Sequence, residues 1–483
     1  MTKKIILSLT VIFLFILSLL PRLYRLDNPV ADWHSWRQAD TAAVSRNFIK
    51  DGFTPLFPRF DALEALNENG QPNPNRYFFA EFPLYNILTY PFYLIFGVNE
   101  AYARFVSAIF ASLTTVSLFF LIRIFTRTRV ALVAAIFFAL IPFNIYYGRV
   151  IMPDPLHVFL SVTALLFYAY YHKKNQHWFF ILLAGLAYAG ALLTKPYALV
   201  LLLPLTVITW QKYGFKAIKN WHLWSFLLIS LLPLLAWRYH INQYPEGMFG
   251  TTWLFNSTNI RFTGAFWRWL IATRLNEVIL GVGGFVLFII GLLFNRQKKR
   301  FLVFYAWFAA MWIFFIIIAT GNVTHDYYQL PILPSLCFFA ALGFWEIVKL
   351  GEKIWQKIFY GLAASGLVAM MLAFSWYQVR GYFNVNHWAI YHAGQYADQN
   401  LPAEAKVIAP YAYDPSFLYQ TNRYGWTIGG EIEEKIAAGA THYITTALNE
   451  EAQVLIEKYQ VVVSNDEFTI LDLRQVIDSE SKP

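Results

Sequence analysis

The feature that most constrains the fold of this chain is a succession of apolar segments, most of them roughly 15 or more residues long, separated by short polar loops. Hydrophobic residues make up 58% of the 483 residues and charged residues only 14%, a balance too apolar for one soluble domain. Helices satisfy their own backbone hydrogen bonds inside a bilayer, so segments of this length are typical of membrane-spanning helices. The sequence therefore predicts a polytopic α-helical membrane protein.

The pattern predicts about eleven spans, and the basic residues of the loops give their orientation. Lys and Arg gather in the loops of one face, where Glu352 is the single acid, which predicts that this face is cytoplasmic. The net charge of +9 follows from this topology, because the basic residues form no single patch of the kind that binds nucleic acid. The predicted spans are residues 5–21, 101–122, 130–147, 155–171, 178–194, 196–210, 223–238, 278–294, 301–319, 329–348 and 357–375.

Three apolar or amphipathic stretches do not fit the pattern of simple spans. Residues 83–97 are too short for a simple span and contain Pro91, so we expect an interfacial or re-entrant helix on the outer face. The outer loop 239–277 carries arginines, including Arg274, beside tryptophans, which predicts an amphipathic helix lying on the membrane. The N-terminal segment resembles a signal peptide, but no small-x-small cleavage site follows it, so we expect a retained helix.

Two hydrophilic regions remain, and the predicted topology places both outside the cytoplasm. The first is the loop 22–82, which follows the first span. The second is a tail in which four short strand-like segments and two helical segments predict a small α/β domain of roughly a hundred residues. We therefore expect a transmembrane domain over residues 1–375 and an extracytoplasmic α/β domain over residues 376–483.

The polar residues most suited to chemistry collect on the outer face. A carboxylate can accept a proton from an attacking hydroxyl, while Arg or Lys stabilises a departing phosphate. Nucleotide sugars are confined to the cytoplasm, so a sugar donor used outside it must be carried on a lipid; no glycine-rich nucleotide motif argues otherwise. The candidate residues are Asp32, His34, Arg37, Gln38, Asp40, Glu81, Arg149, Asp154, Lys195, His325, Asp326, Tyr327 and Tyr328.

Each of these residues also has a purely structural explanation. Arg and Asp near span ends commonly anchor helices at the interface, and Trp33 and Trp36 fit an aromatic belt. Asp154 lies between two prolines in RVIMPDP and fits the N-cap of the following span. An N-cap accounts for one Asp, but it does not account for a cluster of Arg, His and further Asp on the same face. We therefore favour an outward-facing site for an anionic, lipid-linked substrate.

Five short motifs, in a fixed order over about residues 5–350, resemble one family. They are AAVSRNFIKDGFTPLFP, FFAEFPLYNILTYPFYLIFGVNEAYARFVSAIF, YYGRVIMPDP, LLTKPYALVLLLP and HDYYQLPILP. Together they resemble the GT-C-type glycosyltransferases, in particular the protein O-mannosyltransferase and lipid A aminoarabinose transferase group. This resemblance implies transfer of a sugar from a polyprenyl-phosphate donor to a hydroxyl of a protein, lipid or glycan acceptor, with inversion, at the outer face of the cytoplasmic membrane.

The chain departs from this group at two positions of the motifs. The group usually carries an Asp-Glu pair in the first outer loop, where this chain has Arg37 and Gln38. The catalytic carboxylate must then be Asp40 or Asp32, and we favour Asp40 as the general base. The second departure is Phe82, which replaces the lysine that usually follows the equivalent of Glu81.

Because Phe82 replaces this lysine, another cationic side chain must contact the donor phosphate. The candidates are Arg37, Arg149, Lys195 and His325. Asp154 is predicted to support catalysis by positioning, with direct base action as the alternative; further substrate contacts are expected from Asp32, His34, Glu81 and Tyr328. The group mostly needs no catalytic metal, so no cofactor is expected, although Glu81 with His34 or His325 could hold a divalent ion.

Two other classes of function remain open. A transporter or flippase for a lipid-linked sugar is expected to bury charges at mid-membrane and to show internal repeats. A polysaccharide polymerase or ligase is expected to have a large late outer loop, whereas the loop 239–277 is modest in length. The crowding of charged residues on one face favours the glycosyltransferase.

The topology can be tested with single cysteines in a Cys337→Ala background. An impermeant thiol reagent should label Gln460→Cys, and cysteines placed in the loop 22–82, in intact cells, because both regions are predicted to be extracytoplasmic. Labelling of Gln460→Cys only after lysis would overturn the topology.

Overall fold

The computed structural model describes residues 2–64, 70–295 and 297–477. Residues 65–69 of the predicted outer loop, Arg296 of a predicted cytoplasmic loop and the last residues of the tail lie outside this range. The chain forms two compact units. The helical unit comprises Met1–Leu26, Arg104–His240 and Thr251–Tyr382, and the sheet unit comprises Asp27–Ala103, Ile241–Gly250 and Phe383–Pro483.

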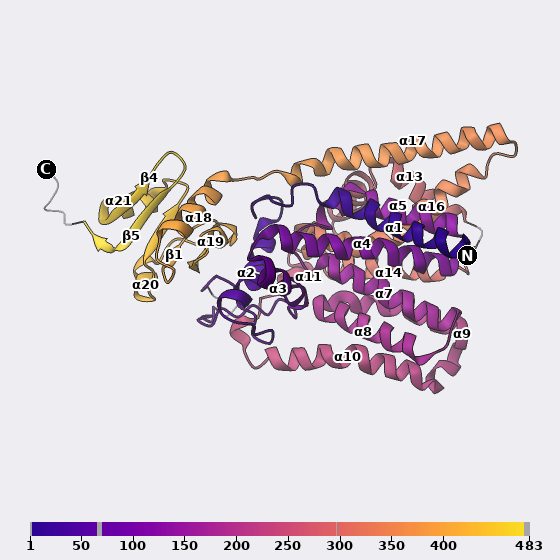
Figure 1. Ribbon diagram of the computed structural model, residues 1–483, viewed down its shortest axis with the longest axis horizontal. Coiled ribbons are helices and arrows are strands. Elements are labelled where there is room, and N and C mark those ends of the chain that lie inside the picture. The colour runs from indigo at the N-terminus through magenta and orange to yellow at the C-terminus, as the bar shows by residue number, and fades with distance from the viewer. Residues whose placement is uncertain (1, 65–69, 296, 478–483) are drawn as a thin grey trace. The chain divides into compact units, whose positions relative to one another are not determined.

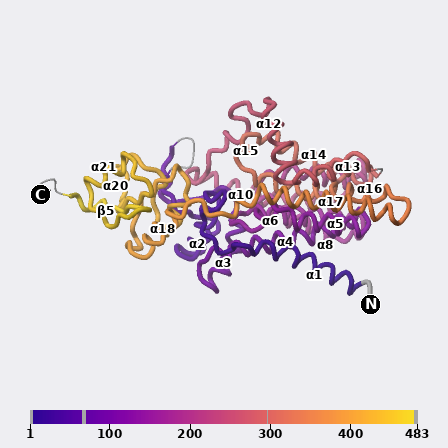
Figure 2. Tube along the Cα trace, turned by 90° about the horizontal axis from the view of Figure 1, so that it is seen from above, coloured from indigo at the N-terminus to yellow at the C-terminus, as the bar shows by residue number. Residues whose placement is uncertain are grey.

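The helical unit consists of helices whose long members run alongside one another in both views (Figures 1 and 2). Its α-helices are α1 (Thr2–Arg22), α4 (Glu100–Phe125), α5 (Thr128–Leu140), α6 (Pro142–Tyr147), α7 (Asp154–Lys173), α8 (Trp178–Thr194), α9 (Leu202–Tyr213), α10 (Trp221–Ile241), α11 (Trp253–Asn256), α12 (Gly264–Arg268), α13 (Gly283–Phe294), α14 (Leu302–Ile317), α15 (Ala319–Thr324), α16 (Leu333–Val348) and α17 (Ile354–Val379). Shorter 3₁₀ turns are η1 (Pro196–Leu201), η2 (Gly214–Lys219), η4 (Ile260–Phe262), η6 (Asp326–Ile332) and η7 (Arg380–Phe383), and η5 (Trp269–Ile279) is a π-helix.

The helices establish a polytopic membrane protein. Among the described residues, six helices are long and apolar enough to cross a bilayer, or up to seven with a bent pair counted as one span. Three further predicted spans coincide with the shorter apolar helices α5, α8 and α14. One predicted span, 278–294, is broken: η5 and α13 meet at 114°, where Gly281 and Val282 both adopt left-handed φ. This break and the three short helices account for four of the five predicted spans that helix length does not give, and the fifth, 155–171, corresponds to α7.

Close packing in the helical unit depends on small residues at helix contacts. Gly291 of α13 and Gly343 of α16 each face the backbone of the other helix, and a Cβ on either would overlap a carbonyl oxygen. Small residues at such positions let helices approach closely, which supplies van der Waals contact where the hydrophobic effect between helices is weak. At the end of α1, the buried Arg22 guanidinium donates to the carbonyls of Ala139 (3.1 Å) and Asn144 (3.2 Å), which ties α1 to α5 and α6.

The sheet unit contains a five-stranded mixed sheet with the order β2-β1-β3-β5-β4. The strand β1 pairs in parallel with β2 and β3, while β5 pairs antiparallel with β3 and β4. The strands are β1 (Lys406–Ile408), β2 (Tyr424–Trp426), β3 (His442–Thr445), β4 (Tyr459–Ser464) and β5 (Thr469–Val476). The helices of this unit are α2 (Ser35–Lys50), α3 (Leu84–Phe96), α18 (Trp388–Asn400), α19 (Ser416–Gln420), α20 (Ile432–Ala437), α21 (Glu450–Lys458) and the turn η3 (Pro245–Gly247).

The small α/β domain predicted for the tail is present. The four strand-like segments correspond to β1, β3, β4 and β5, and the two helical segments correspond to α18 and α21. The edge strand β2 was not predicted, because Gly425 within a polar stretch resembles a turn. A Cβ at Gly425 would overlap the Val407 carbonyl of β1, so the strand needs glycine here.

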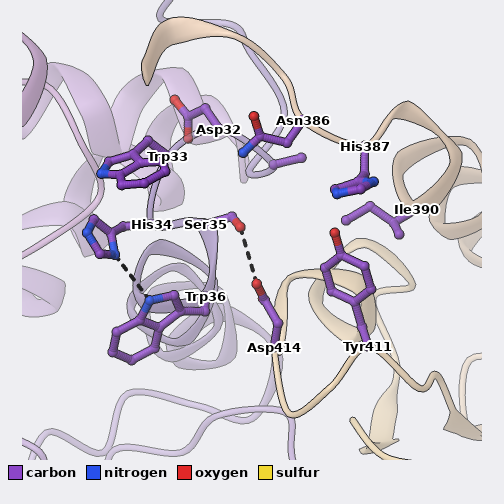
Figure 3. Close-up of a pocket in the computed structure, with 11 residues that line it drawn as sticks. Asp32, Trp33, His34, Ser35, Trp36, Asn386, His387, Ile390, Tyr411 and Asp414 are labelled. Atoms are coloured by element: carbon purple, nitrogen blue, oxygen red, sulfur yellow. Dashed lines mark hydrogen bonds between the residues drawn. The ribbon is translucent and has the colours of Figure 1, made fainter. Parts of the chain in front are cut away.

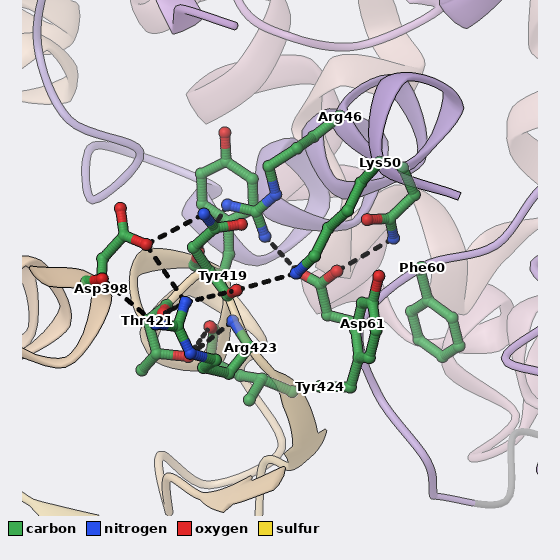
Figure 4. A network of polar contacts seen from close by, with 12 residues as sticks. Arg46, Lys50, Phe60, Asp61, Asp398, Tyr419, Thr421, Arg423 and Tyr424 are labelled. Atoms are coloured by element: carbon green, nitrogen blue, oxygen red, sulfur yellow. Dashed lines mark hydrogen bonds and ion pairs between the residues drawn. The ribbon is translucent and has the colours of Figure 1, made fainter. Parts of the chain in front are cut away.

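The two compact units are not separated at residue 375 of the sequence. The first outer loop and the tail belong to the same unit. Residues 61–63 run beside β2: the Gly425 amide donates to the Asp61 carbonyl (3.1 Å), and the Leu63 amide donates to the Gly425 carbonyl (2.8 Å). The Arg46 guanidinium, from α2, pairs with the Asp61 carboxylate and donates to the Tyr419 carbonyl (2.9 Å), as Figure 4 shows. Loop and tail therefore share one core of buried polar contacts.

This shared core predicts a large effect of Asp61→Asn on stability. The substitution keeps the side-chain shape but leaves the buried Arg46 guanidinium without its ion pair, which typically costs about 3–5 kcal/mol. Lys458→Ala is the matched control, since it removes an exposed pair with Glu433 and should change stability little. Thermal unfolding in detergent measures both; equal melting temperatures for the two variants would contradict the shared core.

Candidate functional site

The helix α2 holds Arg37, Gln38 and Asp40, three of the candidate residues of the first outer loop. Every residue from Arg37 to Phe48 is buried, although the segment is rich in charged and polar side chains. Buried polar groups need hydrogen-bond partners, and α3 supplies some of them: the Asn86 amide donates to the Thr41 carbonyl (2.7 Å) and to the Ser45 hydroxyl (2.9 Å). The apolar segment 83–97 forms α3, which packs on α2 through these bonds.

The carboxylates of the first loop have different surroundings. The Gln38 amide donates to the Asp32 carboxylate (2.6 Å), and the Arg37 guanidinium forms an ion pair with Glu81. Asp40 is buried on the same helix, and this burial raises the pKa of its carboxyl well above the ordinary value, with Arg37 opposing the rise. A raised pKa makes the carboxylate form a stronger proton acceptor, and a general base works best when its pKa lies near the working pH.

The aromatic residues ahead of α2 surround His34. The Trp36 indole donates to the His34 imidazole (3.3 Å), and the Trp33 ring lies edge-on to it at 5.2 Å between centroids. These residues line one side of a cavity of about 250 Å³ (Figure 3). The other side comes from the tail, through residues that sequence analysis did not single out: Asn386, His387, Ile390, Tyr411 and Asp414.

In the helical unit, Asp154 and Lys195 lie together. The Lys195 ammonium is 3.9 Å from the Asp154 carboxylate and 6.0 Å from the ring centroids of Tyr327 and Tyr328. Asp154 and Lys195 are both buried, with 1% and 8% of their surfaces exposed. The expected N-cap role of Asp154 is wrong: the helix begins one residue earlier than predicted, so Pro153 is the cap and Asp154 occupies the first helical turn. Its position beside Lys195 is therefore the better account of this carboxylate.

Arg149 and His325 are placed differently from each other. The buried Arg149 guanidinium donates to the Arg25 carbonyl (2.7 Å) and so holds the turn before α7 against the end of α1. The His325 ring stacks on Tyr327 at 5.3 Å and lies edge-on to Tyr328 at 5.3 Å. The predicted role of Arg149 in binding the donor stays a prediction, and His325 belongs to the same aromatic group as Lys195.

A buried cluster around Asp326 was only partly foreseen. Its carboxylate accepts hydrogen bonds from the hydroxyls of Tyr147 and Tyr382 and forms an ion pair with Arg274 at 3.0 Å. Arg274 lies in the loop that was expected to form an amphipathic helix on the membrane, and its side chain is 13% exposed and pairs with Asp326. The sequence motif HDYYQ gives the position of Asp326, but no local pattern identifies a partner 52 residues away.

The predicted residues thus form two groups. The sheet unit brings together Asp32, His34, Arg37, Asp40 and Glu81, and the helical unit brings together Asp154, Lys195, His325 and Tyr328, with Arg149 at the neighbouring turn. No group of three or more His, Cys, Asp or Glu in the described part of the chain is arranged to hold a metal ion. Glu81, a weak candidate ligand, is paired with Arg37.

Solved structures of membrane glycosyltransferases are similar to this chain over its whole length. ArnT from Cupriavidus metallidurans bound to undecaprenyl phosphate gives a TM-score of 0.65 at 15% identity, with 100% of this chain and 99% of that chain covered. The Archaeoglobus fulgidus oligosaccharyltransferase tethered with an acceptor peptide gives 0.62 at 11% identity, covering 99% and 74%. The archaeal oligosaccharyltransferase AglB from Archaeoglobus fulgidus, in complex with an inhibitory peptide and a dolichol-phosphate, gives a TM-score of 0.59 at 12% identity. The match covers 100% of this chain and 75% of that chain.

The chain is therefore a multi-pass membrane protein with the fold of the GT-C glycosyltransferases. Within that class, residues 12–244 match the model of the dolichyl-phosphate-mannose-protein mannosyltransferase family. No curated protein sequence matches the chain. The resemblance to GT-C-type, polyprenyl-phosphate-dependent glycosyltransferases that the motifs indicate is confirmed.

The burial of Asp40 predicts an unusual pH dependence of stability. The pKa of the Asp40 carboxyl is higher in the folded protein than in the unfolded chain, so the folded protein binds this proton more tightly. The free energy of unfolding therefore falls as the pH rises from the unfolded-state pKa to the folded-state pKa. Asp40→Asn should therefore gain stability relative to the wild type as pH rises towards neutrality. Asp472→Asn is a control of opposite sign, since bonds from Arg474 lower the pKa of Asp472 to about 2 and its ionised form stabilises the fold above the unfolded-state pKa.

Melting temperatures of both variants between acidic and neutral pH measure these effects. Loss of stability in Asp40→Asn at neutral pH, parallel to Asp472→Asn, would show that the Asp40 carboxylate is a structural ion and not a poised base.

Proposed function

We propose that this protein is a glycosyltransferase that moves a sugar from a polyprenyl-phosphate donor to an acceptor hydroxyl on the outer face of the cytoplasmic membrane. The observation that carries the proposal is the GT-C fold over the whole chain combined with a buried carboxylate of raised pKa on α2. Two of the similar structures hold undecaprenyl phosphate or dolichol-phosphate, which supports a lipid-phosphate donor here.

The helical unit supplies the groups suited to the donor. Lys195 is the best-placed cation for the phosphate, because Asp154 holds its ammonium at 3.9 Å while aromatic rings line the same region. An ammonium at this position stabilises the negative charge that develops on the departing polyprenyl phosphate. Asp154 then acts as a positioning residue, and Tyr328 and His325 provide surfaces for the sugar or the isoprenoid chain.

The sheet unit supplies the group suited to the acceptor. Asp40 accepts the proton of the acceptor hydroxyl while the oxygen attacks the anomeric carbon. The bond between that carbon and the phosphate oxygen breaks, and polyprenyl phosphate leaves with the electron pair. A single displacement of this kind inverts the anomeric centre. Asp32 and Glu81 are held by Gln38 and Arg37, which suits them to binding substrate or to orienting the loop.

The finer features of the topology and chemistry belong to the same proposal. We place eleven spans in the bilayer, with α5, α8 and α14 as the short crossings, and the catalytic groups on the extracytoplasmic side, where a lipid-linked donor is available. We also propose that transfer needs no metal ion, because Glu81 already pairs with Arg37 and the protein O-mannosyltransferase and aminoarabinose transferase group that the motifs resemble mostly works without one. Turnover should then persist in EDTA.

The test is transfer from a synthetic polyprenyl-phosphate sugar by the purified protein in proteoliposomes, with envelope membranes from a deletion strain as the acceptor. Asp40→Asn should lower turnover by about a hundred- to ten-thousandfold, the usual contribution of a general base. Asp32→Asn is the matched control from the same loop and should retain more activity. Thermal stability of each variant separates chemistry from folding.

Each contrary outcome has a definite meaning. If Asp40→Asn is active and Asp32→Asn is inactive, Asp32 is the base. If both variants keep wild-type turnover, the proposed mechanism is wrong. Movement of the lipid-linked sugar across the bilayer without transfer would identify a flippase, and joining of whole glycan chains would identify a polymerase or ligase.

A further inference from the structure

We propose that the cavity shared by the start of α2 and the tail binds a sugar ring without a negative charge, as part of the acceptor. This inference deepens the proposed function and rests on it for the word acceptor, while the binding of the sugar itself can be tested without any transfer. The cavity lies wholly inside the sheet unit.

The cavity is built from two distant parts of the sequence. Trp33, His34 and Trp36 lie on one side in Figure 3, and His387 and Tyr411 lie on the other, with Asp414 between them. Two hydrogen bonds join the two sides: the backbone N–H of Asn386 donates to the Ala31 carbonyl (2.8 Å), and the Ser35 hydroxyl donates to the Asp414 carboxylate (3.5 Å). The two walls are thus fixed to each other within one compact unit.

The size and lining of the cavity match one sugar ring. Its volume of about 250 Å³ is below the range of about 300–1,000 Å³ that drug-sized ligands occupy. Aromatic faces accept the apolar C–H face of a pyranose, while carboxylates, imidazoles and amides accept or donate hydrogen bonds to its hydroxyls. The cavity offers both, in the indoles of Trp33 and Trp36, the Tyr411 ring, and the carboxylates of Asp32 and Asp414.

The charge of the lining excludes the donor phosphate. No Lys or Arg is among the described residues that line the cavity, whereas two Asp residues do line it. A phosphate or uronate would be repelled by these carboxylates when they are ionised, and the groups of the lining that could oppose this repulsion are the imidazoles of His34 and His387. A neutral or amine-bearing sugar would not be repelled, so the cavity fits the acceptor side of the reaction better than the donor side.

Backbone strain marks the same cavity. His34 on one wall has φ of 55°, and the tail segment before Asp414 has φ of 50° at Ala412 and 66° at Tyr413. These are left-handed conformations at residues other than glycine, which persist where the surrounding structure imposes them and which occur often at ligand sites. Here the turn at Ala412 and Tyr413 sits between two residues of the cavity wall, Tyr411 and Asp414.

The test is saturation-transfer difference NMR on the full chain in nanodiscs, which avoids sugar-based detergents. The probes are methyl glycosides of glucose, mannose, N-acetylglucosamine and glucosamine, with glucose 6-phosphate as the anionic probe. At least one uncharged or amine-bearing glycoside should bind the wild type, and Tyr411→Ala and Asp414→Asn should each weaken its binding tenfold or more. Tyr411→Phe keeps the ring face and should bind within a few-fold of the wild type.

Asp466→Asn, an exposed tail aspartate away from the cavity, is the matched control and should not change binding. Undecaprenyl phosphate binding to Tyr411→Ala should equal that of the wild type, because the donor groups lie in the helical unit. The proposal is overturned if no glycoside binds the wild type, if the phosphorylated sugar binds best, or if stable Tyr411→Ala and Asp414→Asn bind like the wild type. Specific glycoside binding together with absent transfer would uphold the sugar site and refute the glycosyltransferase.

Discussion

The interaction on which the sheet unit depends is the buried contact of Arg46 with Asp61 and Tyr419. The guanidinium lies 4.2 Å from the Tyr419 ring, pairs with Asp61 and donates to the Tyr419 carbonyl, so one side chain of α2 binds both the first outer loop and the tail. A buried pair of this kind is costly to break, because either partner alone would be left as an uncompensated charge. It therefore fixes where α2 lies in the sheet unit.

The position of α2 in turn sets the electrostatics of the proposed chemistry. Three arginines of the loop are paired with carboxylates: Arg37 with Glu81, Arg46 with Asp61, and Arg76 with Asp51. Asp40 is therefore left in a buried site whose dominant effect is desolvation. Burial disfavours the charged form, which costs stability and raises proton affinity at the same time. Residues that act in function commonly lower the stability of the fold in this way.

The sequence was sufficient for features that arise from local patterns. Apolar length predicts the helices, alternation predicts four of the five strands, and the motif order predicts the GT-C resemblance. It was insufficient where distant residues meet. The pair of Arg274 with Asp326, the cavity wall at Tyr411 and Asp414, and the attachment of residues 61–63 to β2 all depend on contacts that no local spacing encodes. The cap at Asp154 failed for a smaller reason, a helix start displaced by one residue.

The grouping of the first outer loop with the tail gives the tail a defined role. Its residues complete a cavity that the loop alone would leave open on one side. On the proposal made above, the polar residues Asp414 and His387 of this cavity wall serve to bind the sugar.

The most direct measurement of the central claim is mass spectrometry of lipid-linked sugars and envelope glycans in cells lacking this protein. A glycosyltransferase of the proposed kind predicts accumulation of one polyprenyl-phosphate sugar and loss of the matching sugar from an envelope glycan, lipid or protein, with both changes reversed by the wild-type gene and not by Asp40→Asn. Unchanged lipid-linked sugars and an unchanged set of envelope sugars would contradict the account.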